Sequence, residues 1–127
     1  DVSVAGAESS FSVQSASETY CPDGTFKPNR MLDKLKSAYS SSLQEGHPAA
    51  RVTGEMSWAL RGFAGSERLM EYEIGINSVV KSHPITAMCQ YDINEFDPAT
   101  ILYALQVHPY MIMDTSLVKN PYYIVEE

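Results

Sequence analysis

The strongest strand candidates in this sequence are the segments AARVTGEM, residues 49–56, and ITAMCQY, residues 85–91. Each is short and leans apolar, which is typical of a strand buried in a sheet. The first segment carries Glu55 near its end, and Asp92 directly follows the second. Because a helical pattern separates them, we expect the two strands to be parallel neighbours in an α/β sheet.

Three amphipathic helices are predicted from apolar residues that recur every three or four positions. The first begins near Pro28, where the missing N–H of proline is not needed, and stops at Gly46. The second has Ser66 as its expected N-cap and ends before His83-Pro84, and the third begins at Asp97-Pro98. Their inner stripes are Met31, Leu32, Leu35, Ala38, Tyr39 and Leu43; Leu69, Tyr72, Ile76, Val79 and Val80; and Ile101, Leu102 and Leu105.

Shorter strands are predicted near both ends of the chain. Phe11–Gln14 alternates apolar and polar residues, and Tyr110–Met113 and Tyr122–Val125 are expected to form a final antiparallel pair. The full order predicts a single domain, residues 1–127, of the α/β class. It has a mostly parallel sheet flanked by helices and a carboxy-terminal antiparallel strand pair.

Composition excludes several classes of function. The 127 residues carry a formal net charge of −7, and the nine Lys and Arg residues are scattered, which disfavours direct binding to nucleic acid. No apolar run approaches the roughly 18 to 20 residues that span a bilayer, and the amino terminus lacks the pattern of an export signal. We therefore expect a soluble, cytoplasmic domain with no membrane partner.

Glu55 and Asp92 are the leading candidates for a binding site. Ligands of open α/β sheets bind beyond the carboxyl ends of the strands, where both carboxylates are expected to lie. We predict that they face one crevice together with Trp58 and Tyr91. The alternative is that both carboxylates only cap loops or accept hydrogen bonds from backbone N–H groups.

Two further carboxylates, Glu67 and Glu71, lie one helical turn apart and form a second candidate pair. Such a pair is able to hold a cation or a basic group. The preferred alternative is a solvated helix face with Arg68 nearby.

Cysteine and histidine residues give no local metal motif. Cys21 is expected in an accessible loop, and Cys89 inside a buried strand, where a reduced thiol behaves as a small hydrophobe. Each of His47, His83 and His108 precedes a proline at an expected helix end, where an imidazolium helps to terminate a helix. Without a Cys-x-x-Cys motif or a pair of His residues at helical spacing, no locally assembled zinc site is predicted.

No phosphate-binding loop, nucleophile elbow, metalloprotease motif or dinucleotide fingerprint is present. We expect a domain that is not a self-contained enzyme and that holds no cofactor.

Several motifs, in order, resemble the MEDS family of methanogen and methylotroph sensory domains. They are GTFKP at 24–28, RVTGEMSWAL at 51–60, GSERLMEYE at 65–73, HPITAMCQYD at 83–92, His108-Pro109 and NPYY at 120–123. The resemblance implies a ligand-sensing relative of RecA-like and KaiC-like ATPases that is attached to a DNA-binding or histidine-kinase domain. It also implies a response to small hydrocarbon derivatives, such as one-carbon or halogenated compounds.

One departure from the family pattern has consequences. The family normally opens with a Gly-Asp-His-type strand and a helix, and this chain lacks both, so we expect an incomplete domain. The exposed sheet edge of such a domain predicts a homo-oligomer or a strand-exchanged dimer.

Two alternative functions stay open beside ligand sensing. One is a nucleotide-binding ATPase domain, in which Gly54-Glu55 would lie near the acidic position of the ATPases. The other is a purely structural dimerisation domain.

Overall fold

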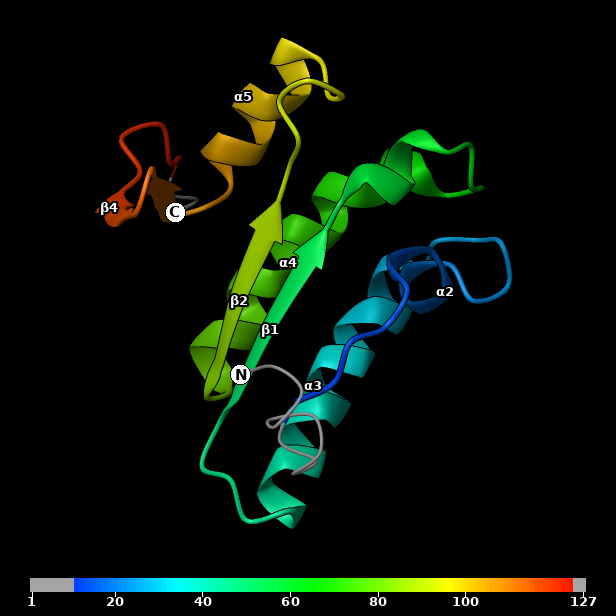
Figure 1. Cartoon of the computed structure of the whole chain (residues 1–127), viewed down its shortest axis with the longest axis vertical. Helices are drawn as coiled ribbons and strands as arrows, with labels where there is room; N and C mark the ends of the chain where they lie inside the picture. The colour runs from blue at the N-terminus through cyan, green and yellow to red at the C-terminus, as the bar shows by residue number, and fades with distance from the viewer. Residues whose placement is uncertain (1–10, 125–127) are drawn as a thin grey trace.

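The computed structural model describes residues 11–124. At its centre lie two strands, β1 (Ala50–Glu55) and β2 (Ile85–Gln90), which pair in parallel, residue for residue, along their whole length. The α4 helix (Leu69–Ser82) connects them, and α3 (Pro28–Gln44) packs beside α4 (Figure 1). The predicted pair of parallel strands joined through a helix is therefore confirmed.

The two helices pack through most of the stripes that their periodicity predicts, but Ala38 and Leu43 of α3 are exposed, which corrects their expected inward position. Met31 and Leu35 of α3 are buried with Tyr72, Ile76 and Val79 of α4 in one apolar core. Proline occupies the first turn of α3 as expected. The helices thus bury their apolar faces against one another and against the strands.

The strands are only half buried, which corrects the prediction of fully buried strands. Exposed and partly buried residues alternate along β1, where Arg51, Thr53 and Glu55 are exposed. The same alternation runs along β2, where Thr86, Met88 and Gln90 are exposed. Because side chains of a strand point alternately to opposite faces, one face of this sheet is open in the described part of the chain.

The predicted strand at Phe11–Gln14 is wrong. That segment has no regular structure, with Phe11 and Val13 exposed, and the short α2 helix (Ala16–Tyr20) follows it. No neighbouring strand among residues 11–124 pairs with the segment, so its alternating pattern has no sheet to join. Ser15 instead caps α2 by accepting a hydrogen bond from the backbone N–H of Glu18.

Two 3-10 turns, η1 (Ser57–Leu60) and η2 (Ser66–Arg68), join β1 to α4. Ser66 is therefore not the N-cap of α4, which corrects the sequence expectation: its hydroxyl donates to the carbonyl of Phe63 at 2.6 Å. Gly65 precedes η2 with φ of 87°, and a Cβ there would collide with the carbonyl of Phe26.

The carboxy-terminal part consists of α5 (Pro98–Gln106) and a hairpin of β3 (Tyr110–Met113) and β4 (Ser116–Lys119). The antiparallel pair and its first strand are confirmed. The second strand was expected at Tyr122–Val125, but residues 122–124 form no strand, and Val125 lies outside the described residues. Asp114, at a positive φ of 55°, turns the chain at once into β4.

Asn120 then holds the next segment against the end of α5. Its buried side-chain amide donates to the carbonyls of Leu105 and His108 at 2.5 and 2.8 Å. These bonds place Tyr122 and Tyr123 in a turn rather than a strand.

The molecule is thus an α/β domain with a two-stranded parallel sheet flanked by helices and an antiparallel pair at its carboxy-terminal end. Within residues 11–124, none of the helices has both the length and the apolar character required to cross a lipid bilayer.

Candidate functional site at the carboxyl end of β2

A buried carboxylate lies at the centre of the site. Glu73 falls on the inner stripe of α4, between Tyr72 and Ile76, and its side chain is wholly buried. A buried carboxylate is costly unless neighbouring groups satisfy its oxygens. The residues around it are therefore expected to be polar.

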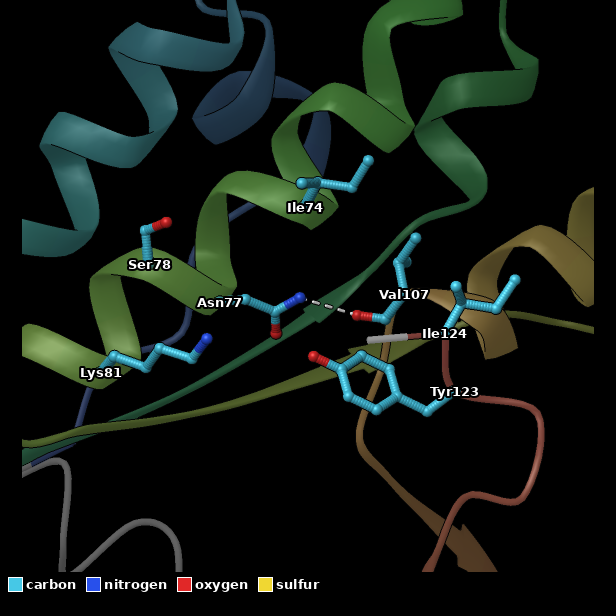
Figure 2. A pocket seen from close by; sticks show the side chains of 7 residues that line it. All are labelled: Ile74, Asn77, Ser78, Lys81, Val107, Tyr123 and Ile124. Atoms are coloured by element: carbon cyan, nitrogen blue, oxygen red, sulfur yellow. Dashed lines mark hydrogen bonds between the residues drawn. The ribbon is translucent and has the colours of Figure 1, made fainter. Parts of the chain in front are cut away.

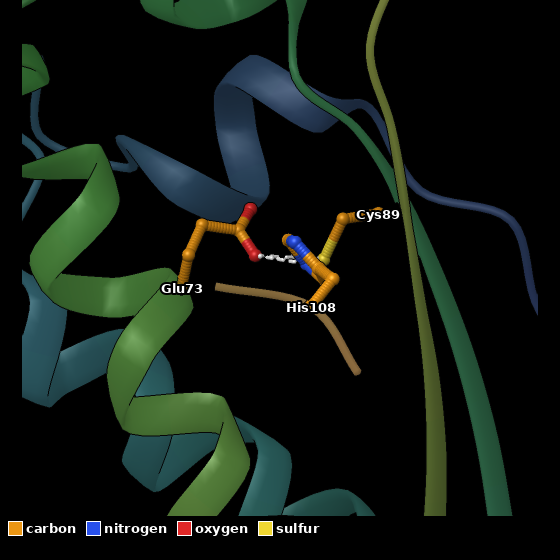
Figure 3. Close-up of side chains that lie close together, drawn as sticks. All are labelled: Glu73, Cys89 and His108. Carbon is orange, nitrogen blue, oxygen red and sulfur yellow. Dashed lines mark hydrogen bonds and ion pairs between the residues drawn. The ribbon is translucent and has the colours of Figure 1, made fainter. Parts of the chain in front are cut away.

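Three side chains from two further segments converge on Glu73. The hydroxyl of Tyr91 donates to Oε1 at 2.7 Å, and the thiol of Cys89 donates to Oε2 at 3.0 Å. Nε2 of His108 lies 2.9 Å from the same Oε2. Figure 3 shows Glu73, Cys89 and His108 pointing toward one point from α4, from β2 and from the segment after α5. We call these four residues the Glu73 cluster.

His108 joins the end of α5 to this cluster. Its Nδ1 lies 2.5 Å from the carbonyl of Ala104, one turn back in α5, as expected for a histidine that ends a helix. Burial by itself lowers the pKa of His108, but the carboxylate of Glu73 outweighs it, and the pKa is raised overall. The Nε2 atom makes no hydrogen bond of good geometry among residues 11–124, so its attraction to Glu73 is mainly that of charge.

Cys89 and Tyr91 are neutral donors in this cluster. Burial raises the pKa of the Cys89 thiol and of the Tyr91 hydroxyl, and the nearby charge of Glu73 raises both further. Cys89 is therefore not the inert small hydrophobe of the sequence interpretation, because its thiol takes part in a buried polar network.

Glu55 lies at the end of β1, opposite Gln90 of β2, and forms a separate polar group. Its carboxylate accepts hydrogen bonds from the backbone N–H of Ser57, at 3.1 Å, and from the Ser57 hydroxyl, at 2.6 Å. The same hydroxyl lies 2.6 Å from Glu95. The loop-capping alternative therefore describes the present contacts of Glu55, while its predicted ligand role stays a prediction.

Trp58 is buried in an aromatic cluster. Its ring stacks on Tyr20 at 4.9 Å between centroids and lies 4.7 Å from Phe26. Its indole N–H has no hydrogen-bond partner in the described part of the chain. Tyr91, by contrast, donates its hydroxyl to Glu73.

Asp92 is exposed and shapes the turn after β2. Its side chain accepts a hydrogen bond from the backbone N–H of Asn94 at 2.8 Å. Its carbonyl accepts from the N–H groups of Glu95 and Phe96. These are the contacts of a capping residue, as the alternative interpretation has it.

Glu67 and Glu71 do not form a pair. Glu67 lies in η2, before α4 begins, whereas Glu71 is exposed and makes a two-pronged ion pair with Arg68 at 2.8 and 3.0 Å. Arg68 holds the pKa of Glu71 below its usual range. The solvated face with Arg68 is what the structure contains.

Of the remaining cysteine and histidine predictions, the one for Cys21 is wrong and the one for His83 is confirmed. Cys21 is buried, not accessible, because it follows α2 into the aromatic core, and both cysteines are free. His83 terminates α4 as expected, with Nδ1 3.2 Å from the carbonyl of Val79. His47 lies just beyond the end of α3 and is exposed.

Two hollows lie near the carboxy-terminal segment. One, of about 190 Å³, opens between α4 and the segments at Val107 and Tyr123, where Asn77 donates to the carbonyl of Val107 at 2.9 Å (Figure 2). The other is an apolar groove of about 430 Å³ along α5, which we call the α5 groove. It is lined by Ile93, Phe96, Pro98, Ile101, Leu102, Leu105 and Tyr122.

The α5 groove contacts the Glu73 cluster through a pair of aromatic rings. The ring of Phe96 meets that of Tyr91 edge-on, with centroids 5.0 Å apart. The apolar groove therefore contacts the buried polar cluster through Phe96 and Tyr91, beyond the carboxyl end of β2.

Comparison with known proteins assigns the chain to a family. Residues 1–109 match the family described as the MEthanogen/methylotroph, DcmR Sensory domain, abbreviated MEDS. The chain belongs to the MEDS family. The motifs that resembled this family in the sequence include three members of the Glu73 cluster within residues 65–92, and His108 with its following proline.

A curated relative of this MEDS domain is the transcriptional repressor DcmR of Methylorubrum extorquens. It is 34% identical over 79 residues, which are 61% of this chain and 30% of the relative. The match therefore spans less than a third of the length of that repressor. No solved structure matches the chain significantly.

Sequence reasoning missed Glu73 as a site residue of this MEDS domain. The signal was present, because Glu73 lies four positions after Leu69 and three before Ile76, on the apolar stripe of α4. A carboxylate in such a stripe predicts polar partners in the core. Which partners they are depends on how β2 and the segment after α5 pack, and periodicity does not show that.

Proposed function

We propose that this chain is the signal-sensing, ligand-binding domain of a regulator or sensor kinase in the cytoplasm, and that it responds to small hydrocarbon derivatives. The observation that supports the proposal most directly is the α5 groove, an apolar hollow that ends at the carboxyl end of β2. Ligand sites of α/β proteins lie at such strand ends, and they are lined mainly by apolar residues with a few polar groups.

Family membership supports the sensory part of the proposal. The MEDS family is defined as a sensory domain, and the relative is a transcriptional repressor. Because this chain matches less than a third of that relative, we propose that the parent protein carries a separate output domain, of the DNA-binding or kinase type. We expect this domain to change the activity of the output domain by binding a ligand and not by catalysing a reaction of it.

The groove suggests how a small molecule is recognised. Phe96 and Ile101 offer apolar contacts, and Tyr91 behind Phe96 connects the groove to the Glu73 cluster. A ligand that moves Phe96 would disturb the hydrogen bond from Tyr91 to Glu73. We propose that this coupling carries the signal, with Glu55 and Asp92 shaping the polar rim at the same strand ends.

Calorimetric titration of the purified chain tests the proposal, with dichloromethane and methanol as the probes. We expect saturable binding of at least one of them. Leu102→Asp places a charge in the groove at a residue that is 45% exposed, and it should weaken binding at least tenfold, which corresponds to about 1.4 kcal/mol. Leu43→Asp is the matched control, because that leucine is 48% exposed and lies on α3, outside the groove.

Absence of heat with every probe contradicts the hydrocarbon-sensing proposal. Equal weakening by both leucine variants would show that the added charge acts through the fold and not through the groove. Binding of ATP, lost on Glu55→Gln, would instead support the nucleotide-binding alternative.

A further inference from the structure

We propose that Glu73, Cys89 and His108 form a binding site for a divalent transition-metal ion of the zinc class. Their candidate ligand atoms all lie within 4.8 Å of one another, on three separate segments of the fold. A thiolate, an imidazole and a carboxylate are together the ligand set that Zn²⁺ takes in proteins, whereas Mg²⁺ and Ca²⁺ prefer oxygen ligands alone.

The orientation of His108 is that of a metal ligand. The carbonyl of Ala104 can only accept a hydrogen bond, so Nδ1 of His108, 2.5 Å away, carries a hydrogen. Nε2 is then the ring atom that faces Oε2 of Glu73, at 2.9 Å. A proton on Nε2 or a metal ion between the two atoms balances the charge of the carboxylate, and a histidine ligand commonly donates its other N–H to a carbonyl in this way.

The buried Nε2 atom contacts Oε2 of Glu73 as an ion pair at 2.9 Å. Among residues 11–124 it makes no hydrogen bond of good geometry, although it lies in the interior. Buried polar atoms of this kind are rare in folded proteins and call for an explanation such as an ion. Its position beside a thiol and a carboxylate points to a metal.

Glu73 is oriented by a neighbour in the same manner. Tyr91 donates to Oε1 at 2.7 Å, which leaves Oε2 directed toward Cys89 and His108. Outer hydrogen bonds that orient ligands are a regular feature of metal sites. The site therefore has its ligands and two supporting contacts, one for His108 and one for Glu73.

Binding requires two of the three pairs of ligand atoms to move apart, while the third pair, Sγ of Cys89 and Nε2 of His108, lies within 4.8 Å. Ligand atoms around one tetrahedral zinc ion stand about 3.3 to 3.5 Å apart, given bonds of about 2.0 to 2.3 Å. The present distances from Oε2 to Sγ and to Nε2 are 3.0 and 2.9 Å. An opening of about half an ångström brings these two pairs to the tetrahedral spacing. On binding, the proton of the Cys89 thiol, with that of His108 when it is protonated, leaves to solvent.

Such an ion would tie the carboxy-terminal segment to the sheet. Glu73 belongs to α4, Cys89 to β2, and His108 to the segment that connects α5 with β3. Three protein ligands leave a fourth tetrahedral position for water or another small ligand.

Titration of the whole chain with Co²⁺, followed by displacement with Zn²⁺, tests the site. We expect one equivalent of Co²⁺ to bind with a thiolate-to-cobalt charge-transfer band, which Zn²⁺ abolishes. Cys89→Ser should remove the band. His108→Gln should weaken metal binding at least about 100-fold, because loss of even an outer hydrogen-bond partner of a metal ligand costs up to about that much. Cys21→Ala and His83→Gln are the matched controls, and they should bind as the wild type does.

The wild-type spectrum decides the question even where a variant does not fold. The proposal would be overturned by a cobalt spectrum without a thiolate band or by the absence of a one-to-one complex. It would also be overturned if the two control variants lost binding while the Cys89 and His108 variants kept it. X-ray absorption of the zinc complex should show one sulfur ligand at about 2.3 Å. A first shell of nitrogen and oxygen only would contradict it.

Discussion

Glu73 is a carboxylate inside the apolar stripe of α4, and its two oxygens are surrounded by Tyr91, Cys89 and His108. Removing a carboxylate from water costs several kcal/mol unless neighbouring groups replace the lost hydration. The three neighbours come from parts of the chain 16 to 35 positions away in sequence. This one side chain therefore holds three segments at a common point.

Substitution of this carboxylate should be strongly destabilising. Glu73→Gln keeps the volume but places an N–H₂ group among donors and removes the charge beside His108. We expect the free energy of unfolding to fall by about 2 to 4 kcal/mol, because a buried network is left unsatisfied. Urea denaturation followed by circular dichroism measures the change.

Glu71→Gln is the control for this prediction. It makes the same chemical change two positions earlier on α4, at an exposed residue paired with Arg68. Exposed ion pairs contribute little, so stability should hardly change. A loss as large as that of Glu73→Gln would contradict the special role of the buried site.

Gly54 is a second residue whose identity is set by a contact. A Cβ at this position in β1 would collide with the hydroxyl of Tyr20, whose ring is held between Trp58 and Tyr72. We expect Gly54→Ala to destabilise the domain by about 1 to 3 kcal/mol, the usual cost of overpacking. The midpoint of thermal unfolding measures it.

Gly75→Ala provides the comparison. Its Cβ would meet a methyl group of Leu32, 2.6 Å away at the end of a flexible side chain, and alanine favours the α4 helix. The near cancellation of these effects should leave stability almost unchanged. A small loss at Gly54 would show that the aromatic cluster is not rigid, and a large loss at Gly75 would show that Leu32 does not move aside.

At the scale of elements, helix α5 begins at a well-formed cap. The carboxylate of Asp97 accepts a hydrogen bond from the backbone N–H of Thr100 at 2.7 Å, and that bond lowers the pKa of Asp97. Since the folded pKa lies below the unfolded value near 4, the cap stabilises the protein above that pH. The contribution is lost as the pH falls through the folded pKa.

Asp97→Asn should remove this pH dependence while keeping a capping side chain. We expect the stability difference between wild type and variant to shrink when the pH falls from about 6 to about 2.5. Denaturation at a series of pH values measures it. A difference that stays constant across this range would mean that the carboxylate is not the titrating group.

At the scale of the whole molecule, the two-stranded sheet has one open face in the described residues. Parallel sheets are usually covered on both faces, and an unpaired strand edge is a site of association. Arg51, Thr53, Thr86 and Met88 are exposed on that face. The expectation of a homo-oligomer or strand-exchanged dimer stays a prediction.

Light scattering over a range of concentrations measures this association. We expect a dimer at high concentration, which Met88→Lys should weaken by placing a charge on the open face. Leu43→Lys changes an exposed leucine on α3 and should leave the dimer intact. A monomer at every concentration would count against association through the sheet.

Much of the element pattern was predictable from local sequence. The stripes of α3 and α4, the Asp97-Pro98 start of α5 and the two parallel strands follow from periodicity and caps, which act over one or two turns. The errors at Phe11–Gln14 and Tyr122–Val125 arose where a strand pattern had no neighbouring strand to pair with among residues 11–124.

The sequence by itself determined the α/β class, the family, and the position of Glu55 and Asp92 beside the strand ends. Only the tertiary structure decided that Trp58 belongs to an aromatic core and that Glu73 meets Cys89 and His108. The physical reason is the distance along the chain over which each kind of interaction acts. Periodicity and capping are local, whereas a buried polar cluster depends on which distant segments the packed core brings within hydrogen-bond distance.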